Sequence, residues 1–349
     1  MTDHTQTASA GATAEKPPEA DRLVTIDDVR AAARTLAGIA VRTPLVPLLP
    51  DRPPRLLKAE SLQPIGAFKI RGAYVAVAGL PKDARARGVI TYSSGNHAQG
   101  VARAARLLGV PAVVVMPSDA PSIKRARVEA DGAEVVVVGP ASEERRVVAE
   151  QLAAERRLAI IPPYDDDRII AGQGTCGLEI VEDLPDVAAI LVPIGGGGLA
   201  SGIAVAARAL RPSCRVIGVE SELAADARDS LAAGRIVAWP AELVSRTIAD
   251  GTRTQSLGAR TFAHLRALLD RVITVGEEEI AAAVRIAAEE ARLVVEPSGA
   301  LSIAALRFHA SEAGLADETR PVVAVVSGGN VDPVRYRAFL AGEPLASLG

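Results

Sequence analysis

Short apolar segments alternate with helical segments along almost the whole chain, and this alternation constrains the fold most. Helical patterns place apolar residues on one face, as in 279–292 with Ile280, Val284, Ala287 and Ala291. The strand-like segments lack the in–out alternation of half-exposed strands: 88–93, 112–116, 133–138, 189–192, 215–220, 271–275 and 321–326. Strands that are buried on both faces and joined by helices predict an α/β protein with mostly parallel sheets.

The length and the turn positions predict how the chain divides into domains. A chain of 349 residues fits one large domain or two of ordinary size. The IPPY segment at 161–164 closes a compact block of strand–helix units, so we expect a small α/β domain at 76–163. This domain would be inserted between the two parts of a large domain, 21–75 and 164–349. Residues 1–20 lack an apolar run, and we expect a disordered tail rather than a signal peptide.

The composition argues against several classes of protein. A net charge of -3 and 3% aromatic residues do not suit a nucleic-acid-binding surface. The two cysteines and four histidines have no zinc-site spacing, and such cysteine usage is normal in the cytoplasm, where we expect this protein. The most apolar stretch, 188–207, contains Pro193 and four consecutive glycines, so a strand and a buried helix explain it better than a membrane span.

Lys69 is notable because lysine is scarce in this chain, which has five lysines against 34 arginines. A lysine amine can form an imine once burial lowers its pKa, whereas a guanidinium stays protonated. The residues around it read LQPIGAFKIRGA. Taken alone, however, Lys69 is more simply interpreted as a solvated surface charge.

The segment SSGNHAQG joins a predicted strand to a predicted helix. Gly95 permits a tight turn there, and the unsatisfied N–H groups of the first helical turn can bind an anion such as a carboxylate. Ser94, Asn96 and His97 add side-chain donors. The alternative is an ordinary helix cap made by Ser or Asn.

Two glycine segments follow predicted strands. Gly195–Gly198 exposes successive backbone N–H groups before a helix expected at Ala200–Ala209, which suits a phosphate. The same segment also fits a dinucleotide fingerprint, with Glu220 as the ribose-binding acid. The second segment, SGGN at 327–330, lies where ligands bind in open α/β sheets, although it can equally be a plain turn.

Together, the four segments resemble the serine/threonine dehydratase and serine racemase family of fold type II pyridoxal-phosphate enzymes. The resemblance runs from about Ile26 to Pro333 and has the motifs LQPIGAFKIRGA, SSGNHAQG, GGGGL and SGGN in the family's order. It implies two open, mostly parallel α/β domains with the cofactor between them. A dinucleotide enzyme would leave the lysine and asparagine motifs unexplained.

The resemblance implies which residues hold pyridoxal phosphate. Lys69 would carry the cofactor as an imine, Phe68 would lie against its ring and Asn96 would bond its ring hydroxyl. Ser327 would meet the pyridine nitrogen. The phosphate would be held by the backbone of Gly195, Gly196, Gly197, Gly198 and Leu199. A serine at the ring nitrogen does not enforce a protonated ring, so the cofactor is a weaker electron sink and suits β-elimination.

The resemblance also implies an activity, the conversion of L-threonine or L-serine into a 2-oxo acid and ammonia. Lys69 would take the Cα proton as a general base. Arg145 aligns with an arginine that faces the substrate in racemases. The substrate carboxylate would bind the loop of Ser93, Ser94, Gly95, Asn96 and His97.

Ser94 leaves the exact activity open. Biosynthetic threonine dehydratases commonly have alanine at this position, whereas serine racemases have serine. A hydroxyl on the face opposite Lys69 would act as a second acid, as racemisation requires, but Ser94 can also simply bind carboxylate. Serine racemase and 3-hydroxyaspartate dehydratase are therefore alternative functions with the same cofactor residues.

Glu220, Ala224 and Asp226 match the spacing of a metal site in the racemases. Two carboxylates and a backbone carbonyl are oxygen ligands that suit Mg²⁺ or Ca²⁺. The alternative is a pair of solvated acids at a strand end. We also expect an amino-acid substrate, a homodimer, and no nucleic-acid or membrane partner.

Overall fold

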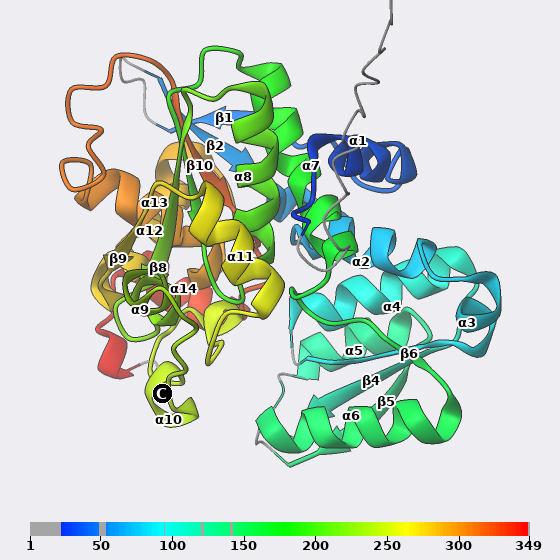
Figure 1. The fold of residues 1–349 in the computed structure, drawn as a ribbon. Helices are drawn as coiled ribbons and strands as arrows, with labels where there is room; N and C mark the ends of the chain where they lie inside the picture. Colours follow the sequence, from blue (N-terminus) through cyan, green and yellow to red (C-terminus); the bar gives the residue numbers. More distant parts are fainter. Residues whose placement is uncertain are drawn as a thin grey trace, which may run out of the picture.

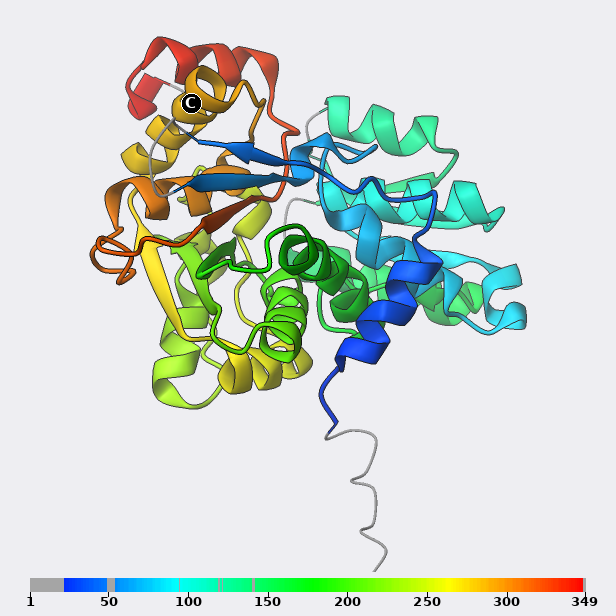
Figure 2. The same ribbon diagram turned by 90° about the horizontal axis from the view of Figure 1, so that it is seen from above.

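The computed structural model describes residues 22–48, 54–93, 95–118, 120, 122–139 and 142–347. Two lobes lie side by side in both ribbon views, and each is built on its own sheet with helices packed over it (Figure 1; Figure 2). This arrangement confirms the predicted α/β class. The tail predicted at 1–20 lies outside the described residues.

The larger lobe has a six-stranded sheet and the smaller lobe a four-stranded one. In spatial order, the large sheet contains β1 (Leu45–Pro47), β2 (Arg55–Ala59), β10 (Val322–Val326), β7 (Ala189–Pro193), β8 (Arg215–Ser221) and β9 (Arg271–Val275). The small sheet contains β5 (Glu134–Val138), β4 (Ala112–Pro117), β3 (Val89–Tyr92) and β6 (Ala159–Ile160). β1 pairs antiparallel with β2, whereas the remaining strand pairs within the described residues are parallel.

Helices cover both sheets and fill the region between them. The six-stranded lobe carries α8 (Gly198–Leu210), α9 (Asp226–Ala233), α10 (Ala241–Val244), α11 (Ala259–Leu268), α12 (Glu277–Ala291), α13 (Pro297–Phe308) and α14 (Pro333–Ala341). The four-stranded lobe carries α3 (Lys82–Arg87), α4 (Asn96–Leu108), α5 (Ser122–Ala130) and α6 (Ser142–Arg156). The remaining elements are α1 (Ile26–Thr35), α2 (Lys69–Ala78), α7 (Asp167–Asp183) and the 3₁₀ turns η1 (Glu60–Leu62), η2 (Asp250–Thr252) and η3 (Leu345–Ser347).

The seven predicted strands are all present, and their ends agree with the prediction to within one residue. The pattern did not predict β1, β2 or β6. β2 includes Arg55 and Lys58, and Lys58 is buried through an ion pair rather than through an apolar side chain. Apolar periodicity predicts helices at Gln99–Leu108 and Ala200–Ala209. In the structure these helices begin earlier, at Asn96 and Gly198, because the periodicity appears only after the first turn.

Helices α2, α7 and α8 pack backbone to backbone through glycines. A Cβ on Gly172 would lie 2.6 Å from the Gly72 Cα, and a Cβ on Gly202 would lie 2.4 Å from the Gly174 nitrogen. Only glycine permits this approach, which explains the GQG segment at 172–174. α2 is continuous across the boundary predicted at 75–76, and its Ala73, Ala76 and Val77 pack into the core of the small lobe. The domain boundaries themselves stay predictions.

A cluster of buried charges ties α2 to β2, η1 and α7. The Arg71 guanidinium is 1% exposed and donates to the carboxylate of Glu60 at 2.7 and 2.8 Å and to that of Glu179 at 2.7 and 2.9 Å. Lys58 donates to Glu179 and to the Thr43 carbonyl, both at 2.6 Å. Two cations and two anions therefore neutralise one another beneath the first turn of α2.

Two findings bear on the predicted surroundings of the protein. Cys176 and Cys214 are both buried and unpaired, so the expected absence of a disulfide framework is confirmed. Across the described ranges, no helix is long and apolar enough to cross a membrane.

Replacing Arg71 by methionine should lower the free energy of unfolding by about 3–5 kcal/mol, because it leaves buried carboxylates without their partner. Urea denaturation measures the difference. Arg87→Met is the matched control, since Arg87 pairs with Asp83 on the exposed face of α3 and should cost less than about 0.5 kcal/mol. Equal losses in the two variants would contradict a structural role for the buried cluster.

Candidate active site

Lys69 is the first residue of α2 and lies at the junction of the lobes. Its Nζ donates to the Pro163 carbonyl at 2.8 Å and lies 5.1 Å from the centre of the Phe68 ring. Burial lowers the pKa of the Lys69 amine to about 8, so a larger fraction of it is neutral near physiological pH than for an ordinary lysine. Lys69 is thus not the solvated surface charge of the alternative interpretation.

The lysine segment is bonded to the SGGN segment more than 250 residues later in the chain. The Phe68 N–H donates to the Ser327 carbonyl at 3.0 Å, and the Gly329 N–H donates to the Gly66 carbonyl at 2.9 Å. Gly66 has a φ of +73°, which favours glycine. The structure therefore brings Lys69, Phe68 and Ser327 together, as the sequence predicted.

Ser327 follows β10 and is 5% exposed. Its hydroxyl donates to the Ser298 carbonyl at 3.5 Å, and the Ser298 hydroxyl in turn accepts from the Gly251 N–H at 2.7 Å. The group that the site offers here is a neutral hydroxyl rather than a carboxylate.

The asparagine loop joins β3 to α4. The N-cap of α4 is Gly95, which has no side chain, so the alternative role of Asn96 as a helix cap is wrong. Instead, the Asn96 Nδ2 donates to the Glu296 carboxylate at 2.6 Å. The Ser93 hydroxyl accepts from the Gly95 N–H at 3.3 Å. Ser94 lies outside the described residues.

His97 is buried, and its Nε2 lies 3.0 Å from the Ile161 carbonyl. Burial, followed by the charge of Lys69, lowers the pKa of His97 to about 3. The imidazole is therefore neutral at physiological pH. Because the Ile161 carbonyl can only accept, the single N–H of the neutral ring is on Nε2, and Nδ1 remains an acceptor without a partner, which can neither donate to a carboxylate nor offer it a positive charge.

Glu296 is a site residue to which sequence reasoning assigned no role. It is 2% exposed and accepts from Asn96, and burial, together with the charge of Asp250, raises the pKa of Glu296 to about 7. A Cβ on Gly328 would lie 2.1 Å from the Glu296 carboxylate, which accounts for a glycine of the SGGN segment. The sequence offers one signal, because the segment EPS at 296–298 is a further match to the family that the four motifs resemble.

The glycine turn follows β7 and leads into α8. Gly197 caps the helix with a φ of +89°, which favours glycine. A Cβ on Gly196 would lie 2.1 Å from the Tyr164 ring, so that ring packs directly on the turn. Bare backbone at a helix N-terminus suits an anion, as predicted for Gly195–Gly198 and Leu199.

Glu220 and Asp226, the predicted metal ligands, lie at the end of β8 and the start of α9 and are at most 1% exposed. The solvated-acid alternative is therefore wrong. Glu220 accepts from the N–H groups of Ala227 and Arg228 at 3.0 and 2.9 Å, while neither carboxylate oxygen of Asp226 has a hydrogen-bond partner. Burial raises the pKa of Asp226 to about 7.

A divalent cation fits this site, because it would satisfy the orphaned buried carboxylate of Asp226. Ala224 lies between the two acids, and its N–H donates to the Ser221 carbonyl at 3.0 Å. Within the described part of the chain, no group of three or more His, Cys, Asp and Glu residues could hold a metal. The ion would thus complete its shell with carbonyl or water oxygens.

Arg145 lies on α6 in the four-stranded lobe and is partly buried. Its predicted contact with the substrate stays a prediction.

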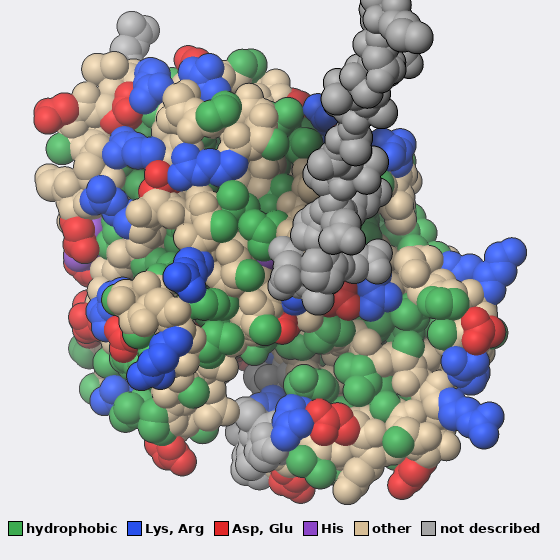
Figure 3. All heavy atoms as spheres, viewed as in Figure 1, with side chains coloured by type: hydrophobic (Ala, Val, Ile, Leu, Met, Phe, Trp, Pro, Cys, Tyr) green, Lys and Arg blue, Asp and Glu red, His purple; other side chains and the backbone are tan. Residues whose placement is uncertain are grey.

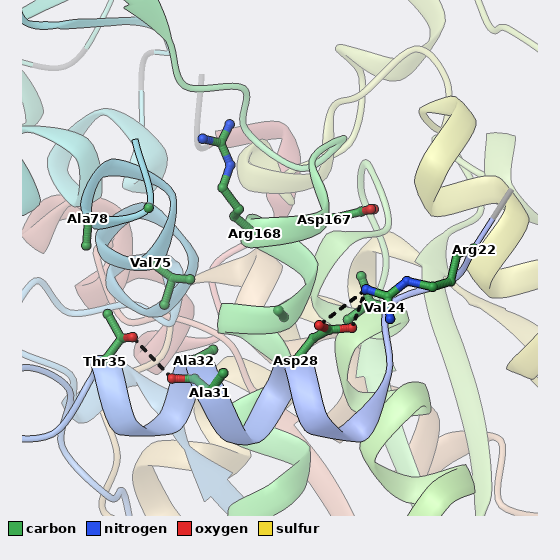
Figure 4. Close-up of a pocket in the computed structure, with 12 residues that line it drawn as sticks. Arg22, Val24, Asp28, Ala31, Ala32, Thr35, Val75, Ala78, Asp167 and Arg168 are labelled. Atoms are coloured by element: carbon green, nitrogen blue, oxygen red, sulfur yellow. Dashed lines mark hydrogen bonds and ion pairs between the residues drawn. The ribbon is translucent and has the colours of Figure 1, made fainter. Parts of the chain in front are cut away.

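The site residues come from both lobes, and the molecular surface is hollowed between the lobes in Figure 3. A separate hollow of about 310 Å³ lies between α1, α2 and α7, with the Arg22–Asp28 ion pair at its edge (Figure 4). Its lining includes Ala32, Val75 and Ala171 but none of the site residues described above. The chemistry is therefore assigned to the junction of the lobes rather than to this hollow.

Comparisons with known proteins agree with this geometry. The family model described as "Pyridoxal-phosphate dependent enzyme" matches residues 36–328. The chain is 43% identical to L-threo-3-hydroxyaspartate ammonia-lyase of Saccharomyces cerevisiae, over 82% of this chain and 86% of the relative. It is 47% identical to L-threonine ammonia-lyase of Geobacter sulfurreducens, over 80% and 68%. The structure of maize serine racemase superimposes with a TM-score of 0.85 at 36% identity, covering 92% of this chain and 98% of that one.

Removal of divalent cations should lower the melting temperature, and Mg²⁺ or Ca²⁺ should restore it. An ion at a hundredfold excess over its Kd stabilises the fold by about 2.7 kcal/mol. Asp226→Asn should abolish this response, because the amide removes the buried charge that the ion satisfies. Asp317→Asn, on the exposed surface, is the control and should keep the response. A melting temperature that is insensitive to exhaustive chelation would refute the metal assignment.

Proposed function

Since the chain belongs to the family of pyridoxal-phosphate-dependent enzymes, we propose that it is an ammonia-lyase acting on L-threonine or L-serine. It would remove water across the Cα–Cβ bond and release a 2-oxo acid and ammonia. The observation that carries this proposal is that the Lys69 amine and the Ser327 hydroxyl both lie at the junction of the two lobes. Two of the relatives, an L-threonine ammonia-lyase and an L-threo-3-hydroxyaspartate ammonia-lyase, are lyases by name and support the reaction class.

The residues at the junction fit the cofactor. Lys69 supplies an amine of lowered pKa, and the glycine turn with Leu199 supplies backbone N–H groups for a phosphate. We assign Phe68 to the face of the ring, Asn96 to its hydroxyl and Ser327 to its nitrogen. When bound, the cofactor accepts the electrons released as the Cα–H bond breaks.

Lys69 is also the general base in this proposal. Displaced from the cofactor by the substrate amine, its Nζ would take the Cα proton, and the pKa of about 8 suits that exchange near neutral pH. The Pro163 carbonyl, which accepts from Nζ at 2.8 Å, would hold the amine in place. The N–H groups at the start of α4 would bind the substrate carboxylate, with Ser93, Ser94, Gly95, Asn96 and neutral His97 around it.

Ser327 favours elimination over transamination. Because a hydroxyl does not force a proton onto the ring nitrogen, negative charge is not stored extensively on the ring. A substrate whose β-hydroxyl leaves as water removes that charge itself. L-threonine and L-serine both meet this requirement.

Two alternatives remain from the same family. Serine racemase is one, supported by the likeness to the maize racemase structure and by a serine at position 94, which would protonate Cα from the face opposite Lys69. An ammonia-lyase for 3-hydroxyaspartate is the other, supported by the yeast relative. Its second carboxylate would require a cation, for which we assign Arg145.

We also propose a cytoplasmic homodimer with Mg²⁺ or Ca²⁺ at Glu220, the Ala224 carbonyl and Asp226. The two buried, unpaired cysteines support a reducing compartment.

Lys69→Ala should lose the visible absorbance of the lysine-bound cofactor and lower turnover by several orders of magnitude, because both the tether and the base disappear. Lys82→Ala is the control, since Lys82 is exposed at the start of α3, whereas Lys58 is buried in the charge cluster. Spectra after addition of pyridoxal phosphate and a 2-oxo-acid assay give the two readouts. Turnover of Lys69→Ala within about tenfold of the parent would exclude Lys69 as the base.

A substrate panel distinguishes the three activities. We expect kcat/KM, measured from 2-oxo-acid release, to be higher for L-threonine or L-serine than for L-threo-3-hydroxyaspartate. L-serine in deuterated water should give mainly pyruvate and a minor amount of D-serine. In Ser94→Ala the D-serine should disappear while elimination from L-threonine persists, because elimination uses one face only.

Other outcomes would point to the alternatives. D-serine as the main product would make the enzyme a racemase, and 3-hydroxyaspartate as the best substrate would identify the second alternative. Undiminished D-serine from Ser94→Ala would refute the role of Ser94.

A further inference from the structure

The chain contains only two asparagines, Asn96 and Asn330, and the fold brings them into contact. They lie 234 positions apart in the sequence, yet the Asn330 Nδ2 donates to the Asn96 Oδ1 at 2.8 Å. Asn96 is the first residue of α4 in the small lobe, and Asn330 follows β10 in the large lobe. The amide–amide bond therefore crosses the junction at the candidate site.

The orientation of the Asn330 amide is fixed from two sides. Arg127 donates through its Nη1 to the Asn330 Oδ1, and a guanidinium can only donate. On the other side, the Asn330 Nδ2 donates to the Ile65 carbonyl at 2.8 Å, and a carbonyl can only accept. Both neighbours require the same orientation, with the amide nitrogen toward Ile65 and Asn96.

This orientation is passed on to Asn96. Because Asn330 presents its nitrogen, Asn96 must present its oxygen, and its own Nδ2 then donates to the Glu296 carboxylate at 2.6 Å. A rotated Asn96 amide would place two nitrogens together on one side and two oxygens on the other. Each donor in the series Arg127, Asn330, Asn96 therefore faces an acceptor on the next residue, ending at Glu296.

The backbone at Gly66 leaves room for the Asn330 amide. A Cβ on Gly66 would lie 2.5 Å from the Asn330 Oδ1, so a side chain there would displace the amide. Arg127 approaches from α5 of the small lobe, where Lys124 also reaches the large lobe through an ion pair with Asp250 at 2.7 Å. Arg127 and Glu296 are bonded to the asparagine pair, and the charges of Lys124 and Asp250 act on Glu296.

We propose that Asn330, held by Arg127 and the Ile65 carbonyl, is a positioning residue that fixes the amide of Asn96 with its nitrogen available as a donor. The inference rests on the proposed function, in which Asn96 bonds the ring hydroxyl of the cofactor. An amide nitrogen carries two N–H groups, and Glu296 takes one of them. The other can donate to an ionised ring hydroxyl and so stabilises the ionised form.

Nuclear magnetic resonance detects the side-chain amide groups of Asn96 and Asn330 directly when the side-chain nitrogen of asparagine is isotopically labelled. Two asparagines give only two side-chain amide groups, and Asn330→Asp leaves one, which assigns both. In the parent protein, with and without pyridoxal phosphate, both groups should be protected from rapid hydrogen exchange, because both are bonded in the fold. In Arg127→Met, both groups should shift or exchange faster.

Asn330→Asp keeps the shape of the side chain but replaces its donor nitrogen by an acceptor oxygen. A carboxylate at 330 pairs with Arg127 but cannot donate, so the Asn96 nitrogen should turn toward it. The ionised ring hydroxyl then loses its donor. We expect the apparent pKa of the visible cofactor band to rise by roughly one unit and kcat to fall about tenfold, with KM within twofold.

Arg127→Met and Arg127→Lys complete the series. The methionine variant should move the band in the same direction as Asn330→Asp but by less, because the Ile65 carbonyl still holds Asn330, and the lysine variant should restore it. Arg125→Met is the matched control, since Arg125 lies on the same helix and pairs with Glu129 at the surface. It should change neither the amide signals nor the band.

The outcomes separate this inference from the proposed function. If the parent protein forms no visible band with pyridoxal phosphate, the cofactor role of Lys69 fails. If the parent band forms and neither Asn330→Asp nor Arg127→Met alters its pH dependence, the positioning role of Asn330 is refuted. If Asn330→Asp does not fold, the amide signals and band of Arg127→Met decide the question alone.

Discussion

The buried guanidinium of Arg71 is the interaction on which the arrangement of the site depends. It lies two residues after Lys69 in the first turn of α2, and its donors reach Glu60 after β2 and Glu179 on α7. These two segments, 11 and 108 positions away in the sequence, are therefore fixed relative to one turn of helix. The charges are balanced within the cluster, so the cost of desolvation is offset by complete pairing. This cluster therefore fixes the position of the Lys69 backbone at the start of α2.

The segments of the site are brought together by main-chain hydrogen bonds and by close contacts with bare glycine backbone. The Phe68 N–H meets Ser327, the Gly329 N–H meets Gly66, and the Tyr164 ring packs on bare backbone at Gly196. Glycines at these places do not provide general flexibility. They remove the Cβ that would keep two segments apart, and so allow the ends of β7 and β10 to converge on α2 and α4.

The sequence predicted the fold class and most of the site because both depend on local signals. Continuous apolar strands identify an α/β fold, and the motifs place Asn96, the glycine turn and Ser327 after strand ends, where the structure has them, whereas Lys69 begins α2. β2 was missed because its Lys58 is buried by an ion pair whose partner, Glu179, lies far along the chain. Glu296 and Asn330 were assigned no role for the same reason: their importance comes from contacts across the lobes, which no local pattern records.

The segment 161–164 has a mechanical consequence. It leads from β6 of the small lobe to α7, its Pro163 carbonyl holds the lysine amine, and its Tyr164 ring rests on the glycine turn. These two contacts belong to adjacent residues. Any rotation of one lobe against the other that is transmitted through this segment would displace the amine and the anion-binding turn in concert. The amine and the turn are therefore coupled through two neighbouring residues of the same connection.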